Sequence, residues 1–212
     1  MKTRQDQIVC CALLCVACGI VDAMGYLRHG IFAANMTGNT VLLGISLSQM
    51  QWADAVDRAT PLVVFFVGAM LARLLLTHTG RRPWIPLLLE AVLLILALAL
   101  LPDSKWSLSL ITFAMGVQAT AVTQFAGVTL STVVVTSTMA RISEALADRL
   151  GFVRRQPPAA AAGSPALPLY LLTWVCYLAG ALLAGIGGAQ SVIAMMGAAA
   201  MVLAAAGMTR AA

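Results

Sequence analysis

The sequence predicts an all-α polytopic membrane protein with six full spans and two polar re-entrant or broken segments. Its 212 residues are 61% hydrophobic and 10% charged, with a mean hydropathy of +0.93, which excludes an ordinary soluble domain. Several runs reach the roughly 18 to 20 apolar residues needed to cross a bilayer. The net charge of +5 comes from loop residues that membrane topology explains, so it indicates no nucleic-acid partner.

The first predicted span runs from Ile8 to Leu27 after the basic residues Lys2 and Arg4. It resembles a signal peptide, but further spans follow, so we interpret it as a retained helix. Four of the five cysteines lie in this span, and buried cysteine behaves as a small apolar residue. No cluster of histidines or carboxylates accompanies them, so we expect neither a metal site nor a cofactor. The cysteines of this span are Cys10, Cys11, Cys15 and Cys18.

A polar, uncharged segment follows, and its centre reads F-A-A-N-M-T-G-N-T-V-L-L-G from Phe32 to Gly44. Lipid offers no hydrogen bonds, so such a segment is tolerated at membrane depth only where protein or a water-filled cavity surrounds it. We expect a helix that breaks at Gly38 and is capped by Asn35 or Asn39, as at transporter solute sites. The alternative is an ordinary polar stripe between packed helices.

The rest of the chain alternates spans with short loops. A second polar, uncharged segment runs from Val128 to Ala140, and a linker near 149–168, rich in proline and alanine, is predicted to be a cytoplasmic surface loop. The remaining predicted spans are Pro61–Thr77, Trp84–Leu101, Ser107–Phe125, Leu169–Gly188 and Ser191–Met208.

The order of these elements predicts an internal duplication of one membrane domain, with repeats at 1–105 and 106–212. Gly19 and Gly30 have the same separation as Gly116 and Gly127. A G-A-x-L-A motif also begins at both Gly68 and Gly180.

The number of spans depends on whether the two polar segments cross the membrane. If both cross, eight spans form two parallel repeats; if both dip in and return, six spans form an inverted three-plus-three repeat. The six-span arrangement leaves only Arg28, Arg58 and Lys105 outside, with both termini in the cytoplasm. The positive-inside rule therefore favours six spans.

Two acids lie within spans, Asp22 and Glu90. An ionised acid is costly in hydrocarbon, so each is expected to face the protein interior and is a candidate for proton coupling. The alternatives are a structural pair of Asp22 with a cation or a backbone N–H group, and a buried, protonated Glu90 that donates a hydrogen bond.

The candidate solute-binding residues are the hydroxyls and amides of the two polar segments and the preceding span. Gln118 and Gln124 either line the same cavity or make a contact between helices. Gly180, Ala184 and Gly188 form a small-residue face that packs inside the monomer or makes a homo-oligomer contact. The candidate set is Asn35, Thr37, Gly38, Asn39, Thr40, Gln118, Gln124, Thr132, Thr136, Ser137 and Thr138.

Nothing in the sequence predicts an enzyme. His29 and His78 lie at span ends, and no nucleophile–base pair or nucleotide-binding glycine motif is present.

Gly19-Ile20-Val21-Asp22-Ala23, the Phe32–Gly44 run, Glu90 in its apolar helix and Gly116-x-Gln118 resemble the signature of the YoaK-like family. Where that family tends to have a Thr-Gly pair in its second half, this sequence has Thr136-Ser137. The resemblance implies an integral protein of the bacterial inner membrane, of a family grouped by a domain of unknown function and loosely regarded as permeases.

These features predict a secondary transporter of a small polar or anionic solute, coupled to protons through Asp22 or Glu90. Its two polar segments are expected to meet near the membrane midplane. The alternative functions are a channel for a small solute or an ion, and a non-transporting membrane scaffold or sensor.

Overall fold

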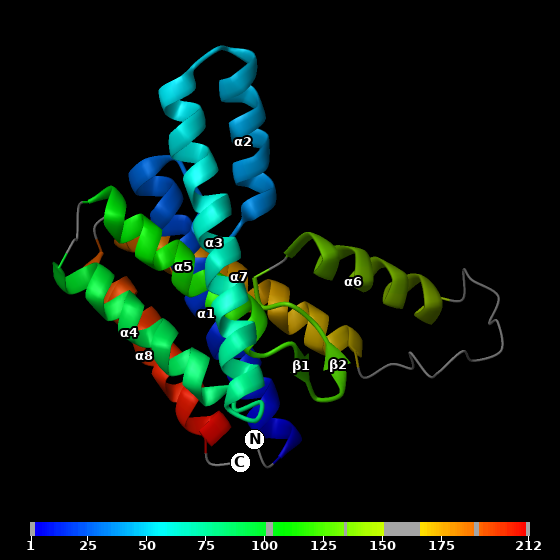
Figure 1. Cartoon of the computed structure of the whole chain (residues 1–212). Coiled ribbons are helices and arrows are strands. Elements are labelled where there is room, and N and C mark those ends of the chain that lie inside the picture. Colours follow the sequence, from blue (N-terminus) through cyan, green and yellow to red (C-terminus); the bar gives the residue numbers. More distant parts are fainter. Residues whose placement is uncertain (1–2, 101–103, 134, 151–165, 189–190, 211–212) are drawn as a thin grey trace.

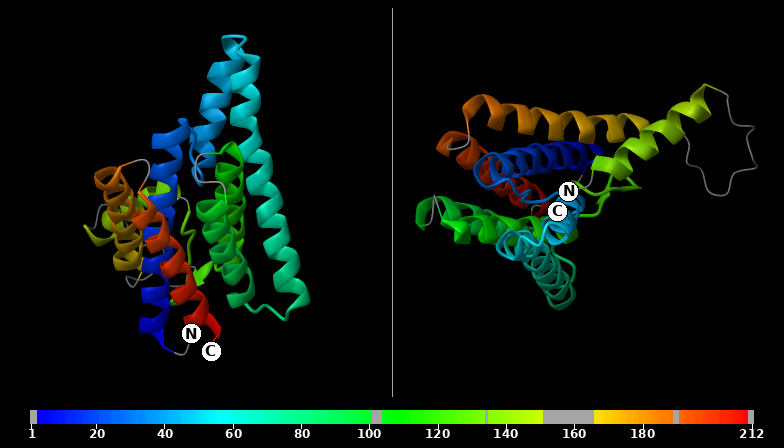
Figure 2. Two further views of the ribbon diagram at one scale, coloured as in Figure 1. Left: turned by 90° about the vertical axis from the view of Figure 1, so that its left-hand side faces the viewer. Right: turned by 90° about the horizontal axis from the view of Figure 1, so that it is seen from above.

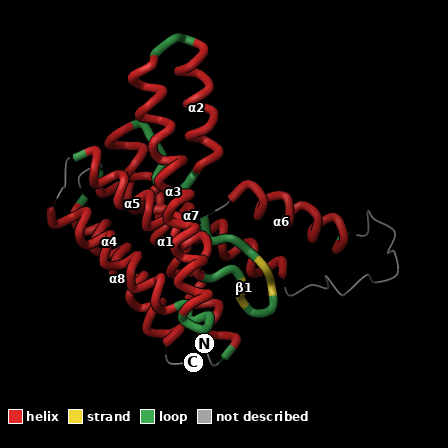
Figure 3. Tube along the Cα trace, in the orientation of Figure 1, coloured by secondary structure: helices red, strands yellow, loops and turns green. Residues whose placement is uncertain are grey.

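Helices make up nearly all of the computed structural model, which describes residues 3–100, 104–133, 135–150, 166–188 and 191–210. Figure 3 shows the helices together with one short pair of strands. The described elements are α1 (Arg4–His29), α2 (Met36–Ser48), α3 (Trp52–His78), α4 (Trp84–Leu100), α5 (Lys105–Ala121), β1 (Gln124–Phe125), β2 (Val128–Thr129), α6 (Val135–Arg149), α7 (Ala166–Gly187) and α8 (Val192–Arg210).

The helices predicted from hydropathy are confirmed, with bounds that differ by a few residues at α1, α4, α7 and α8. Helix α1 begins at a capping box in which Thr3 and Asp6 bond to each other's backbone N–H groups, and it ends at Gly30 in the left-handed conformation. Helix α3 begins earlier than predicted, at Trp52, so Pro61 lies inside it.

Among the described helices, α1, α3, α7 and α8 are long and apolar enough to cross a membrane, and α4 is a shorter apolar helix. Large apolar side chains such as Phe66 on α3, Leu182 on α7 and Ile193 on α8 are exposed. Helix α1, in contrast, is mostly buried among the others. An apolar exterior around a central helix is the arrangement of a protein surrounded by lipid, so the chain is a membrane protein.

The helices pack in pairs along their length. Helix α1 packs against α7 and α8, while α5 packs against α3 and α4, and α4 also packs against α8. Helices α1 and α5 run antiparallel, because Gln7 bonds to Ala126 just beyond the end of α5, and a Cβ on Gly25 would touch Leu108 near its start.

Glycines allow the closest of these crossings. A Cβ at Gly19 would lie 2.1 Å from the carbonyl oxygen of Tyr177, and a Cβ at Gly116 would lie 2.1 Å from that of Phe65. Gly180 and Gly68 occupy the opposite sides of the same two crossings. Of the predicted small-residue face, Gly180 therefore packs against α1 inside the monomer, whereas a Cβ on Gly188 would meet open space.

The prediction that the two polar segments meet is wrong. Helix α2 packs against α3, and α6 packs against α7. Figure 1 shows α2 rising beside the first half of α3 while α6 lies to the right, beside α7, and the second view of Figure 2 also separates them. Asn39, a buried polar side chain of α2, bonds to Phe32 in the same segment, and the apolar Val41, Ile45 and Leu47 of α2 are exposed, so this segment finds its polar partners without the other half.

The prediction that a helix continues to Phe125 is also wrong, because α5 ends at Ala121 and a β-hairpin follows. Strands β1 and β2 are antiparallel, and the two turn residues Ala126 and Gly127 both have positive φ, 52° and 82°. Two positive φ values are typical of a tight hairpin turn, and Gly127 tolerates one at little cost. Most of the predicted linker, residues 151–165, lies outside the described residues.

Candidate functional site

Asp22 ties three parts of the fold together. Its Oδ1 accepts hydrogen bonds from the backbone N–H groups of Ala34 (2.7 Å) and Asn35 (3.1 Å), and its Oδ2 accepts one from the Tyr177 hydroxyl on α7. The Asp22 side chain is 1% exposed. Of the two interpretations of Asp22, the structural pair with backbone N–H groups is thus present, and this pair fixes the loop between α1 and α2.

The prediction that the helix breaks at Gly38 is wrong: the helical structure is interrupted between Gly30 and Asn35, and Gly38 lies in the first turn of α2. Asn35 caps this helix as predicted, because its Oδ1 accepts the N–H of Gly38 at 3.1 Å. Asn39 clamps the loop: its Oδ1 accepts the Phe32 N–H at 2.9 Å and its Nδ2 donates to the Phe32 carbonyl at 2.7 Å. A side chain on Gly38 would meet the Phe32 ring at 2.9 Å.

Gln118 joins the two halves of the chain. Its Nε2 donates to the Leu14 carbonyl on α1 at 3.1 Å and to Thr132 Oγ1 at 2.9 Å. Its Oε1 is buried and has no hydrogen-bond partner among the described residues. Gln124 is exposed on β1, so the two glutamines do not line one cavity.

The remaining candidates are scattered. Thr37 and Thr40 on α2 and Thr136 and Ser137 on α6 are exposed, whereas Thr138 is buried. Of the eleven predicted solute-binding residues, the structure brings together Asn35 and Asn39 in one cluster and Gln118 and Thr132 in another.

Glu90 forms no hydrogen bond with either cluster. Its side chain is fully buried in α4, and neither carboxyl oxygen has a hydrogen-bond partner in the described part of the chain. It lies within electrostatic range of the Cys10 and Cys18 thiols of α1. Across the described ranges, no three histidine, cysteine or acidic residues are placed to hold a metal ion.

An open groove of about 340 Å³ lies where the end of α1 meets the starts of α3 and α5. Arg58 shapes its rim by donating to the Gly30 carbonyl at 3.2 Å. The groove is lined by His29, Ile31, Asp57, Thr60, Pro61, Trp106, Leu108 and Ser109.

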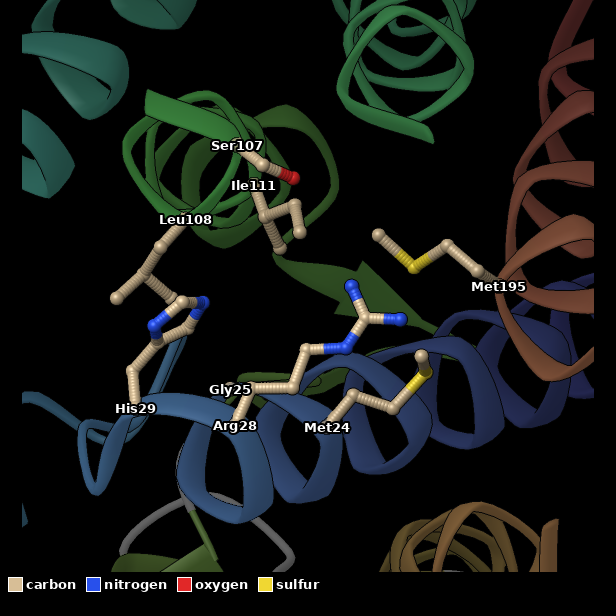
Figure 4. Close-up of a pocket in the computed structure, with 8 residues that line it drawn as sticks. All are labelled: Met24, Gly25, Arg28, His29, Ser107, Leu108, Ile111 and Met195. Carbon is tan, nitrogen blue, oxygen red and sulfur yellow. The ribbon is translucent and has the colours of Figure 1, made fainter. Parts of the chain in front are cut away.

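Beneath the groove lies a void of about 10 Å³, room for roughly one water molecule. Figure 4 shows the Arg28 guanidinium reaching from α1 into the space between α5 and α8, with the Met24 and Met195 side chains beside it. Ile111 projects from α5 toward the same space. These side chains pack around the small void beneath the groove.

Two parts of this arrangement were not predicted from the sequence. Tyr177 holds Asp22 across a sequence separation of 155 residues. A tyrosine in an apolar span needs a partner for its hydroxyl, and this was the available signal. Asp57, Thr60 and Ser109 line the groove, and nothing in the sequence singled them out as site residues.

Comparisons with known proteins agree with the membrane architecture. Residues 10–209 match the model of the family described as "Protein of unknown function (DUF1275)". The chain belongs to the DUF1275 family. It is 32% identical to the UPF0700 transmembrane protein YoaK of Bacillus subtilis (strain 168) over 156 residues, which cover 68% of this chain and 69% of YoaK. No solved structure matches the chain. The YoaK-like resemblance of the sequence is thus confirmed, and with it a transmembrane relative of unknown function.

Proposed function

We propose that this DUF1275 protein is a secondary transporter that couples the movement of a small polar or anionic solute to protons, and is not an enzyme. The observation that carries the proposal is Glu90, a fully buried carboxyl group with no hydrogen-bond partner among the described residues. Ionisable groups inside membrane bundles are costly and mark ion or proton pathways by default. A carboxyl group without a structural partner is free to take up and release a proton as its access to water changes.

The groove at the end of α1 is the proposed solute entrance. Its volume of about 340 Å³ lies within the range of small-molecule sites, and it offers hydroxyl, imidazole, carboxylate and indole groups. The packed side chains beneath it separate it from Glu90. An open groove above packed side chains supports alternating access over a continuous channel.

An inverted repeat of six spans underlies the proposed mechanism. The pair α1–α7 has the same glycine crossing as the pair α5–α3, and the corresponding helices α1 and α5 run in opposite directions. Helices α4 and α8 are also antiparallel, since Arg210 lies over the ring of Trp84, 5.2 Å from its centre. Helix α2, with 13 residues, is about 20 Å long and too short to cross. These features support repeats at 1–105 and 106–212.

The orientation follows from charge. Both termini lie at one end of the bundle (Figure 2), and Arg81 and Arg82 follow α3 at that end. Arg28 and Arg58 lie at the other end, beside the groove. The positive-inside rule puts the termini in the cytoplasm and the groove on the outer side of a bacterial inner membrane.

Uptake into proteoliposomes tests the proposal, with pools of labelled amino acids, carboxylates and sugars as solutes. Thr60→Trp fills the groove and is expected to lower uptake about tenfold. Thr77→Trp is the matched control, because Thr77 is also exposed on α3 and bonds to the carbonyl four residues earlier, away from the groove. Equal uptake by the two variants would contradict the assignment of the groove.

A non-transporting scaffold is the second candidate. The hydrogen bonds of Asp22 and Asn39 favour it, because these two side chains hold backbone and another helix within the chain. Folded protein that takes up none of the pooled solutes would support the scaffold.

A further inference from the structure

Buried polar atoms rarely lack partners, and in the described part of this protein three side chains carry such atoms: Glu90, Thr112 and Gln118. The unpartnered atoms are both carboxyl oxygens of Glu90, the Thr112 hydroxyl and Oε1 of Gln118. Glu90 and Gln118 lie on α4 and α5, two helices that pack against each other.

The register of these helices brings Glu90 and Gln118 together. Ser107 Oγ donates to the Ala97 carbonyl at 3.2 Å, which marks the faces that α4 and α5 turn to each other. Glu90 lies seven residues before Ala97 and Gln118 eleven residues after Ser107. These separations are close to two and three helical turns, so both residues lie on the facing sides, about 6 Å apart along the axes.

The direction of the two side chains reduces the axial separation between Glu90 and Gln118. Helical side chains lean toward the N-terminus of their own helix. In an antiparallel pair, Glu90 therefore leans toward the level of Gln118, and Gln118 leans toward the level of Glu90. Contacts with α1 agree, because Gln118 bonds to the Leu14 carbonyl, and Glu90 lies within electrostatic range of Cys10 and Cys18, one turn to either side of Leu14.

Gln118 also holds the β-hairpin that covers this end of the bundle. Its Nε2 bonds to Thr132, directly after the hairpin, and the Ala126 N–H at the turn bonds to Gln7 on α1. Phe125 on β1 is fully buried. The hairpin lies at the end of the bundle that carries the chain termini (Figure 1), opposite the groove.

A carboxyl group that faces an amide suits a different end of that amide in each of its two protonation states. A protonated carboxyl group donates a hydrogen bond, and Oε1 of Gln118 is the acceptor at hand. Nε2 then stays with Leu14 and Thr132. An ionised carboxylate only accepts hydrogen bonds, so it competes with Leu14 and Thr132 for the Nε2 hydrogens.

We propose that Glu90 and Gln118 form a proton-operated latch on the cytoplasmic gate, in which protonated Glu90 keeps Gln118 bonded to Thr132. When the β1–β2 hairpin opens transiently, the Glu90 proton passes to cytoplasmic water, and the carboxylate that remains competes for Nε2 of Gln118 and keeps the hairpin released. This rests on the proposed proton-coupling role of Glu90 and adds the device that links the proton to opening of the second side. Gln118 is a positioning residue in this latch.

Few other charged groups face the latch. The described residues of α5 from Trp106 onward include no acid or base, and on α8 the single charged side chain, Arg210, lies over Trp84. Helix α1 contributes the Cys10 and Cys18 thiols. Helix α3 has few contacts with α4, and its charged or titratable side chains near this end are Arg73 and His78.

Hydrogen exchange of residues 122–133 tests the latch, with the full-length protein in lipid nanodiscs at pH 5 and pH 9 and rates corrected for intrinsic pH dependence. Native protein is expected to lose about tenfold protection in this segment at pH 9. Glu90→Gln, which donates at every pH, is expected to stay protected at both.

Two further variants disrupt the latch at Gln118 and Thr132 instead of at Glu90. In Gln118→Leu and Thr132→Val, the amides of residues 122–133 are expected to exchange fast at both pH values. If Gln118→Leu does not fold, Thr132→Val alone tests this expectation. Gln124→Leu, an exposed glutamine on the hairpin itself, is the matched control and should behave like native protein.

The latch would be contradicted if the hydrogen-exchange protection of residues 122–133 in native protein did not change with pH. It would also be contradicted if Thr132→Val and Gln124→Leu exchanged at the same rate. If Glu90→Gln nevertheless abolished proton-coupled uptake, the transporter would stand without this gate. If native protein showed the pH-dependent gate but no uptake of any solute, the proposed function would fail and the latch would remain.

Discussion

At the residue scale, the first polar segment is held by its own amides and by one acid. Asn39 bonds to both backbone groups of Phe32, and Asp22 accepts two N–H groups from the loop before α2. Bonds of this kind stabilise the break between helices. Loss of Asn39 or Asp22 is therefore expected to act on folding before it acts on any solute.

Two substitutions of Asp22 are expected to lower the free energy of unfolding by different amounts. Asp22→Ala leaves two buried N–H donors and the Tyr177 hydroxyl without a partner, and is expected to lower the free energy of unfolding by roughly 3 kcal/mol. Asp22→Asn keeps an acceptor for the N–H groups and should cost about 1 kcal/mol. Thermal unfolding in detergent, followed by size-exclusion chromatography, measures the order.

Thr37→Ala is the control for this series, because Thr37 is exposed on the same segment. An Asp22→Ala protein as stable as Thr37→Ala would show that the loop is held by other contacts.

At the element scale, the closest helix pairs depend on glycine. Gly19 and Gly116 each face a backbone carbonyl that leaves no space for a side chain, and their partners Gly180 and Gly68 lie in the same crossings. In lipid, helices associate through close packing and not through the hydrophobic effect, so the loss of such a contact has a large effect.

Gly116→Ala is expected to destabilise the protein by roughly 3 kcal/mol, because α3 and α5 must move apart to accept the methyl group. Gly197→Ala on α8, where a Cβ would meet open space, should be neutral or stabilising by about 0.5 kcal/mol. Yields of monodisperse protein and melting temperatures of the two variants measure the difference, and equal values would contradict the packing of the α3–α5 crossing.

The sequence predicted the positions of the helices better than it predicted which helices and side chains contact each other. The long helices follow from hydropathy, and the repeated spacing of Gly19 and Gly116 pointed to the positions that make the two crossings. The bond between Asp22 and Tyr177 could not be predicted, because residues 155 apart carry no sign of their pairing in a single sequence. The supposed meeting of α2 and α6 failed for the same reason: polarity shows that a segment needs partners and does not show which ones.

At the scale of the whole molecule, the groove, Glu90 and the hairpin lie in order from one end of the bundle to the other. The groove is open, the side chains below it are packed, and the opposite end is covered by the hairpin. This order suits a transporter open to one side. In this order Glu90 lies between the groove and the hairpin, so its protonation can act on the hairpin at the end opposite the groove.

The most direct measurement is the acidification of proteoliposomes that contain a pH-sensitive dye, upon addition of the solute found by uptake. Native protein and Glu144→Gln, an exposed acid paired with Arg141, are expected to acidify the lumen as solute enters. Glu90→Gln is expected to reduce the proton signal at least to about one tenth while it remains folded. Proton movement by Glu90→Gln at the native rate would contradict the account.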